Sequence, residues 1–141
     1  MSAYKLIKCS IKDFDSLIKA LADLGLKPSI HEEPKKLRGF LNDEREQLAE
    51  IIIPKEQLNK LFTKASNDLG FAFNEETGQY DMICSEYDDK LNIPGRIKQA
   101  YAKAVIEEAL ESQYFSVESN DNEELKQRKQ IKVQIVGKKF I

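Results

Sequence analysis

The chain has 141 residues and a formal net charge of −2, with 41% hydrophobic and 33% charged residues. This length predicts a single domain, 1–141, that can bury its own core, and the acidic balance does not favour a general binder of polyanions. The sequence has neither an apolar run of about 18 residues nor a signal-peptide apolar region. We therefore expect no membrane contact and a cytoplasmic location, or the plastid stroma if the protein is organellar.

The first quarter of the chain predicts a strand followed by a helix. Apolar and polar residues alternate from Tyr4 to Ile11, which is typical of a strand with one buried and one wet face. Apolar residues then recur at helical spacing, at Phe14, Leu17, Ile18, Leu21 and Leu24. Asp13 is placed to cap this helix, and Gly25 to end it in a left-handed conformation.

The middle of the chain predicts short strands separated by turns. The expected strands are 29–33, 36–41 and 48–53, with Pro28 and Pro34 around the first and a solvated turn at 42–47. A short inserted amphipathic helix is expected at 54–66. A hairpin is expected from 69–73 and 80–84, with Gly78 as its residue of positive φ.

The longest predicted helix runs from Asn92 to Gln113, with Asn92 as its cap and Pro94 in its first turn. We expect its apolar stripe to lie across the sheet, formed by Ile97, Tyr101, Val105 and Ala109 and flanked by Ala102, Ala104 and Ile106. Strands at 114–119 and 131–135 should follow, on either side of a mobile loop at 120–130. The order predicts an α+β fold, with two main helices on one face of a mostly antiparallel sheet. The favoured topology is a ferredoxin-like core with added hairpins.

Few residues suggest a catalytic, redox or metal-binding role. P-loop, GxGxxG, GxSxG and HExxH motifs are all absent. His31, followed by Glu32 and Glu33, could act as a base or as half of a metal site, but no second histidine completes a ligand set, which favours a surface histidine. Cys9 and Cys84 alternate with apolar residues, which favours two reduced, buried thiols over a disulfide, a redox pair or a nucleophile. We therefore expect no enzymatic activity, no metal and no cofactor.

Three charged features leave alternatives open. The carboxylates of SEYDDK (85–90) resemble a cation loop but lack the ligand alternation of an EF-hand, so a solvated loop is favoured. Glu108 lies either on the flank of the long helix, which we favour, or buried beside its stripe, where it could be functional. The basic residues after Glu124 form either a phosphate-contacting edge or a solvated tail; the scarcity of aromatic partners favours the tail.

Several short pieces resemble a known family. They are the opening M-S-x-Y-x-x-I-K-C-x-I-K-D, Leu17–Gly25, Arg38-Gly39-Phe40, 51–54, 68–71, Gly78-x-Tyr80, 97–102 and Phe115-x-Val117. Together they resemble the plastid and cyanobacterial "hypothetical chloroplast frame thirty-five" proteins, a domain of unknown function also met in other bacteria and in phages. The resemblance implies a small non-catalytic protein accessory to an AAA+ ATPase. The segment Lys55–Asn67 departs from the family's pattern, and its added helix could be a contact surface.

The expected function is therefore that of an interaction or adaptor protein with a protein partner, which could be an AAA+ ATPase or another larger assembly. Candidate binding positions are Arg38, Phe40, Tyr80, Arg96 and Tyr101. Alternatively, the three aromatic residues fill the core and the two arginines pair with surface carboxylates. A second hypothesis is a modulator of phage type that binds a small ligand or nucleic acid, and a third is an enzyme that uses Glu108 or His31.

Overall fold

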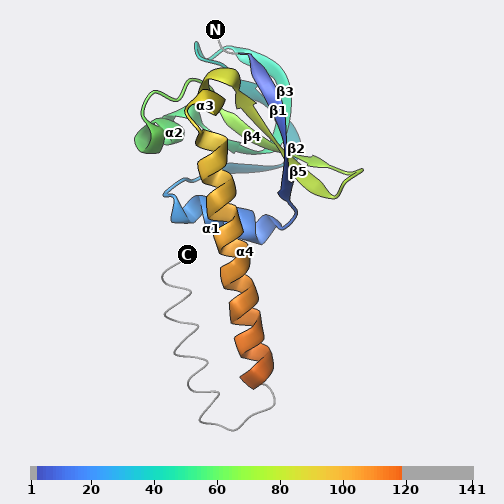
Figure 1. Ribbon diagram of the computed structural model, residues 1–141. Coiled ribbons are helices and arrows are strands. Elements are labelled where there is room, and N and C mark those ends of the chain that lie inside the picture. The colour runs from blue at the N-terminus through green and yellow to red at the C-terminus, as the bar shows by residue number, and fades with distance from the viewer. Residues whose placement is uncertain (1–2, 119–141) are drawn as a thin grey trace.

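The computed structural model describes residues 3–118, which form a five-stranded sheet with helices on one face (Figure 1). In chain order the elements are β1 (Tyr4–Ile11), α1 (Phe14–Asp23), β2 (Ser29–Arg38), β3 (Glu44–Ile53), α2 (Lys55–Phe62), β4 (Leu69–Asn74), β5 (Gln79–Ser85), α3 (Glu86–Lys90) and α4 (Ile93–Glu118). All neighbouring strands pair antiparallel, in the order β1-β5-β4-β3-β2. The predicted α+β class is confirmed. Within it, β1 lies at an edge beside β5, which differs from a ferredoxin-like core, where the first strand is interior.

The main core lies between the sheet and the helices. Helix α1 contributes Leu17, Ala20 and Leu21, and α4 contributes Ile93, Ile97 and Ala104, against sheet residues that include Ile53, Phe71, Met82 and Cys84. Helix α2 adds Leu58. The alternation in β1 holds as predicted, because Cys9 and Ile11 are buried while Leu6 is exposed. The predicted placement of two main helices on one face is therefore correct.

The opposite face of the sheet has a smaller core of its own. Leu37, Ala49, Ile52 and Ile83 are buried there, with Tyr4 packed against them. Tyr4 belongs to one edge strand, yet its hydroxyl donates to the carbonyl oxygen of Asp68 at 2.6 Å and lies 2.9 Å from that of Arg38, the last residue of the other edge strand. The sheet is thus curled until its two edges approach at one end.

Local caps and turns follow their residue chemistry. The Asp13 carboxylate accepts hydrogen bonds from the backbone N–H groups of Asp15 and Ser16, as an N-cap should. Gly25 ends α1 at φ 79°, and Gly78 turns the β4–β5 hairpin at φ 71°. All three predictions are confirmed, as is a short helix within 54–66, observed as α2.

The edge hairpin differs from the prediction. The strands expected at 29–33 and 36–41 are one strand, β2, which runs through Pro34 and ends at Arg38. Proline is tolerated because β2 is an edge strand whose pairing with β3 shifts register between Ile30 and Lys35. The expected solvated turn at 42–47 is wrong after residue 43, since β3 begins at Glu44.

Two other predictions are corrected. The SEYDDK segment is the short helix α3 following its Ser85 cap, and Asp88 within it is buried, accepting the backbone N–H groups of Ser66 and Asn67. The strand expected at 114–119 is wrong up to residue 118, because α4 continues to Glu118. No glycine or proline stops the helix there, and each further residue adds a hydrogen bond at little cost. The loop predicted at 120–130 and the strand at 131–135 lie outside the described residues.

Candidate interaction surface on the long helix

The first half of α4 is fixed to the body of the protein. Ile93, Ile97 and Ala104 are fully buried against the sheet and α1. Tyr101 is buried beside them, and its hydroxyl accepts hydrogen bonds from the backbone N–H groups of Lys12 and Asp13, each at 3.0 Å. This pins the helix to the turn between β1 and α1. Tyr101, a predicted binding residue, therefore fills the core and holds that turn.

The second half of α4, which ends at Glu118, extends past the sheet, as Figure 1 shows. The side of α4 that faced the core continues here into acidic residues. Glu108 is half-buried beside α1, and the Ser16 hydroxyl donates to its Oε2 at 2.6 Å. Glu108 thus lies on the side of α4 that faces α1, nearly in line with Ile97, so the favoured flank position is wrong, although Glu108 is not a member of the core.

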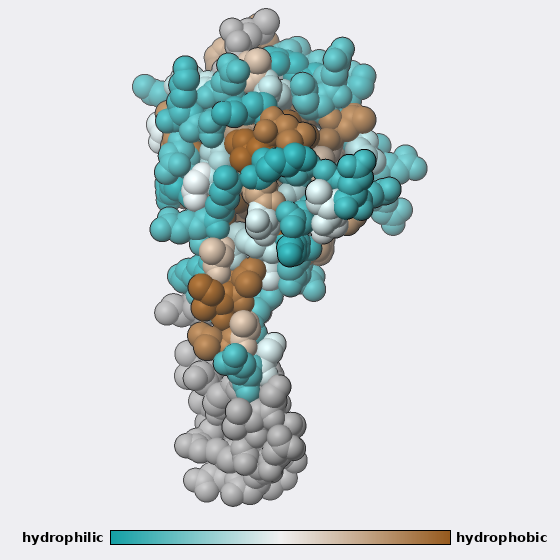
Figure 2. All heavy atoms as spheres, turned by 45° about the vertical axis from the view of Figure 1, so that its right-hand side comes forward, coloured by the Kyte–Doolittle hydropathy of each residue, from teal (hydrophilic) through white to brown (hydrophobic). Residues whose placement is uncertain are grey.

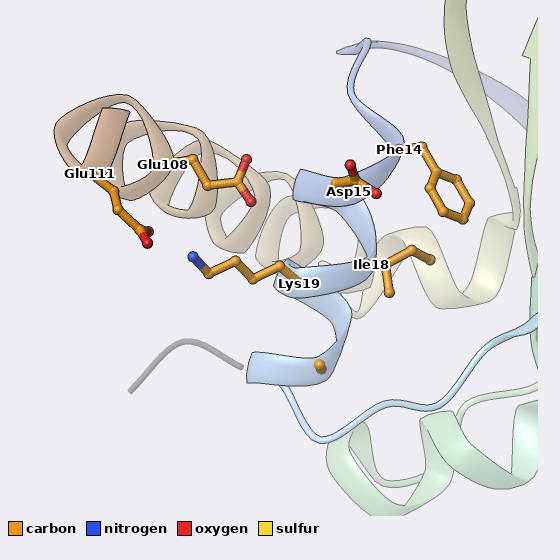
Figure 3. A pocket seen from close by; sticks show the side chains of 7 residues that line it. Phe14, Asp15, Ile18, Lys19, Glu108 and Glu111 are labelled. Carbon is orange, nitrogen blue, oxygen red and sulfur yellow. The ribbon is translucent and has the colours of Figure 1, made fainter. Parts of the chain in front are cut away.

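A groove separates this part of α4 from α1. It has a volume of about 420 Å³ and is lined by Phe14, Asp15, Ile18, Lys19, Ala22, Glu108 and Glu111. Figure 3 shows Lys19 extending from α1 toward Glu108 and Glu111 of α4. The groove therefore has an acidic rim with one lysine, and its lining lacks a histidine or cysteine that could act as base or nucleophile.

The opposite side of the projecting helix is apolar and exposed. We define the outer face of α4 as Ala102, Val105, Ile106, Ala109 and Leu110, all exposed. The exposed fractions of the Ile106 and Leu110 side chains are 59% and 58%. At about 100° per residue, Ile106 at the centre of this face lies opposite the buried Ile97, and Val105 lies at its edge. Figure 2 shows the resulting brown surface on the projecting part of the helix.

The second half of the predicted apolar stripe is wrong, because its residues belong to the exposed outer face. The sequence places Val105 and Ala109 in line with Ile97 and Tyr101, toward the sheet. An i+4 row drifts by about 40° per step around a straight helix, so that after two steps it has turned well away from the core. Ala104 is the last residue of α4 in the core, and the apolar residues beyond it, Val105, Ile106, Ala109 and Leu110, are exposed. The predicted stripe omits Leu110 because it lies outside that row.

Arg38, the first of the predicted binding residues, forms hydrogen bonds and ion pairs within the protein. Its backbone N–H and its Nε both donate to Oδ2 of the buried Asp68, at 2.9 and 3.0 Å, and its Nη2 lies 2.7 Å from Glu56 Oε1. These carboxylates raise the pKa of the Arg38 guanidinium, and the arginine lowers the pKa of Glu56. Asp68 also accepts the backbone N–H of Lys55, so it joins β2, α2 and β4. Sequence reasoning missed Asp68 because nothing in its local pattern indicates burial.

The other candidates lie apart from one another. The guanidinium of Arg96 on α4 stacks over Phe62 at the end of α2, 4.9 Å from the ring centroid. Tyr80 is half-buried on β5 and meets Phe73 edge to face. Phe40 is 56% exposed in the turn between β2 and β3. The structure thus brings together no single site from the five predicted positions.

The residues with a possible catalytic or metal-binding role do not form a common site either. His31 lies on β2, where its Nε2 is 3.1 Å from the Ser29 hydroxyl. Cys9 and Cys84 are free and buried, as expected, and burial raises the pKa of both thiols. Among residues 3–118, no three His, Cys, Asp or Glu side chains are grouped as a metal ion would require.

Comparison with known proteins gives one match. The family described as "Protein of unknown function (DUF1257)" matches residues 20–131, a range that holds most of the motif pieces singled out above. No curated protein and no solved structure matches. Within the described part of the chain, no helix is both long and apolar enough to span a membrane.

Proposed function

The chain belongs to the DUF1257 family, and we propose that it is a non-catalytic interaction protein whose contact surface is the outer face of α4. The observation that supports this is the reversal of the helix's apolar side. Residues 93–104 turn their apolar side toward the core, whereas residues 102–110 turn theirs toward solvent. Single exposed apolar residues are common on protein surfaces, but five at helical spacing on a projecting segment form a contiguous patch.

The shape and chemistry of this patch define the kind of partner. It is a convex helical stripe of small and branched side chains, without an aromatic ring or a charge at its centre. Such a stripe packs best against the apolar face of another helix, with ridges in grooves and helix axes about 8–10 Å apart. The proposed occupant is therefore a helix of another protein chain.

The resemblance to the chloroplast frame thirty-five proteins extends this proposal. It supports an accessory role beside an AAA+ ATPase or another larger assembly, in the cytoplasm or in the plastid stroma. The absence of catalysis is part of the same proposal. It is supported by the engagement of Glu108 with Ser16 and by the burial that keeps both thiols protonated.

A photo-crosslinking experiment tests the proposal. A photoreactive phenylalanine analogue at Ile106 is activated in the native host, the crosslinked protein is identified, and its binding to the pure chain is measured. We expect the double variant Ile106→Glu, Leu110→Glu to lose at least about tenfold in affinity, because two carboxylates would be buried in an apolar contact.

Leu41→Glu is the matched control. Leu41 is 68% exposed in the turn between β2 and β3 and is not part of the outer face, so Leu41→Glu should change the affinity little. If the double variant binds every crosslinked protein as tightly as the wild type does, or if Leu41→Glu weakens binding as much, the outer face is not the contact surface.

A further inference from the structure

We infer that the outer face of α4 takes a second copy of this chain, in an antiparallel pair of helices whose two-fold axis passes between Ile106 and Ala109. The inference rests on the proposed function, since it names the partner of that same surface. It is carried by the order of large, small and charged residues along the exposed side of α4.

The centre of the outer face repeats with the spacing of a coiled-coil seam. Gln99, Ala102, Ile106, Ala109 and Gln113 follow one another at alternating steps of three and four, and all five are exposed. The apolar members are central and the glutamines stand at the two ends. Small residues on both sides of Ile106 let two helix backbones approach closely and leave room for a large side chain of the other helix.

An antiparallel pair sets large residues of this seam against small ones. With the axis between Ile106 and Ala109, each Ile106 faces Ala109 of the other copy, and each Ala102 faces Gln113. The two-fold axis makes every such contact twice, so the patch is complementary to itself. In a parallel pair each residue would face its own copy, so each layer of two isoleucines would be followed by a layer of two alanines that leaves a gap.

Two lysines on the flanks of the seam disfavour the parallel arrangement. Lys98 lies on one flank and Lys103 on the other, and both are exposed. In a parallel pair opposite flanks adjoin, so Lys98 of each copy would lie beside Lys103 of the other and repel it.

The antiparallel arrangement avoids this repulsion because equal flanks adjoin. Lys103 of each copy then lies beside Leu110 of the other, where its aliphatic stem can cover the leucine while the ammonium group stays beside Glu107 of its own helix, 3.8 Å from Oε1. On the other flank, Val105 lies beside Ser112, which is exposed and uncharged. The charges therefore select the antiparallel orientation.

The bodies of the two copies do not obstruct this pairing. The core face of α4, with Ile97 and Ala104, lies on the side opposite the outer face. Each sheet therefore lies behind its own helix, away from the contact. Among residues 3–118, the second half of α4 projects beyond the sheet (Figure 1), and an antiparallel pair places the two bodies at opposite ends.

The size of the patch sets the expected strength. The outer face and its edges would bury on the order of 400 Å² per copy, about half of a standard interface. A dimer of this size is weak and depends on concentration, with a dissociation constant in the range of roughly ten micromolar to one millimolar.

Single-cysteine crosslinking tests both the contact and its direction. Both native thiols are buried, so introduced cysteines are the reactive ones under mild oxidation. We expect Ala102→Cys and Gln113→Cys to form a disulfide-linked dimer when the two variants are mixed. Each should fail to link with itself, because the antiparallel arrangement places its two copies about 16 Å apart along the helices.

Exchange of the large and small residues gives an independent readout. Sedimentation velocity over about 10–500 μM covers the expected range of strength. Ile106→Ala should weaken the dimer at least about tenfold by emptying two contacts, and Ala109→Ile should weaken it by overfilling them. The double variant Ile106→Ala, Ala109→Ile should restore it, because each new isoleucine faces a new alanine. Leu41→Glu should have no effect.

Three results would overturn the inference. They are linking of Ala102→Cys with itself, a double variant as weak as the single ones, and a wild-type chain that is monomeric throughout this range. If the chain is monomeric while Ile106→Glu, Leu110→Glu still abolishes binding of another protein, the second copy is the wrong partner and the proposed function stands.

Discussion

Removal of the Asp68 carboxylate should destabilise the fold more than any change at an exposed charge. Asp68 Oδ2 accepts from the backbone N–H and Nε of Arg38, and Oδ1 accepts from Arg38 Nη2 at 3.1 Å and from the backbone N–H of Lys55 at 2.9 Å. The Asp68 side chain is 4% exposed, whereas that of Arg38 is 38% exposed. In Asp68→Ala, two backbone donors therefore lose their acceptor in a closed site, while the guanidinium remains partly hydrated.

The magnitude follows from these contacts. Each orphaned backbone N–H costs about 1–1.5 kcal/mol, and the half-exposed ion pair contributes no more than about 1 kcal/mol. We expect Asp68→Ala to lower the free energy of unfolding by about 3 kcal/mol, which corresponds to a fall of roughly 10 °C in Tm for a chain of this size. Urea unfolding measures the change directly, with a lower midpoint at an unchanged m value.

The matched control is Asp89→Ala. Asp89 Oδ2 lies 2.8 Å from Lys5 Nζ in an ion pair that is open to solvent. Removal of this carboxylate should therefore leave the unfolding midpoint within experimental error of the wild-type value. A loss of less than about 1 kcal/mol for Asp68→Ala would refute the assignment of Asp68 as the joint between β2, α2 and β4, because a single orphaned N–H already costs that much.

Three further predictions concern the core and the thiols. Tyr101→Phe removes the acceptor of two backbone N–H groups and should lower the free energy of unfolding by about 1–2 kcal/mol in urea titrations. Gly70→Ala would bring a Cβ within 2.7 Å of the Ala49 Cβ, so calorimetry should show a loss of about 1–3 kcal/mol, and an unchanged Tm would contradict this packing. Since burial raises the pKa of Cys9 and Cys84, a thiol reagent at about pH 8 should label the native chain far more slowly than the unfolded chain. The free energy of unfolding should be unaffected by these thiols at lower pH and should fall as the pH rises above about 8.5, where only the unfolded thiols ionise.

The local sequence pattern was sufficient to predict those features that depend only on a residue and its near neighbours. Alternation placed β1 correctly, and the cap at Asp13 and the positive φ of Gly25 bounded α1. Burial of both cysteines followed from their apolar neighbours. These features depend on a residue and its near neighbours, so a single sequence contains what is needed to infer them.

Features set by distant partners could not be predicted in the same way. Asp68 and Asp88 are buried because backbone donors far along the chain meet them, and neither has a local signal for this. The outer face of α4 was hidden for a related reason. The composition of residues 102–110 indicates an apolar side but does not say where the sheet beneath it ends. The strand expected after Gln113 failed because alternation at the end of a long helix is a weaker signal than helix propagation.

The position of β1 has a consequence for the way the chain is made. Among the five strands of the sheet, β1 is made first and waits longest for a neighbour, since Tyr4 is paired with Ser85. Strands β2 to β5 can add one hairpin at a time as they emerge, whereas β1 cannot join them until β5 exists. During synthesis, the backbone hydrogen-bonding groups of β1 therefore stay without their partners until Ser85 has been made. Until then β1 is an unpaired strand edge, the kind of segment that chaperones protect from aggregation.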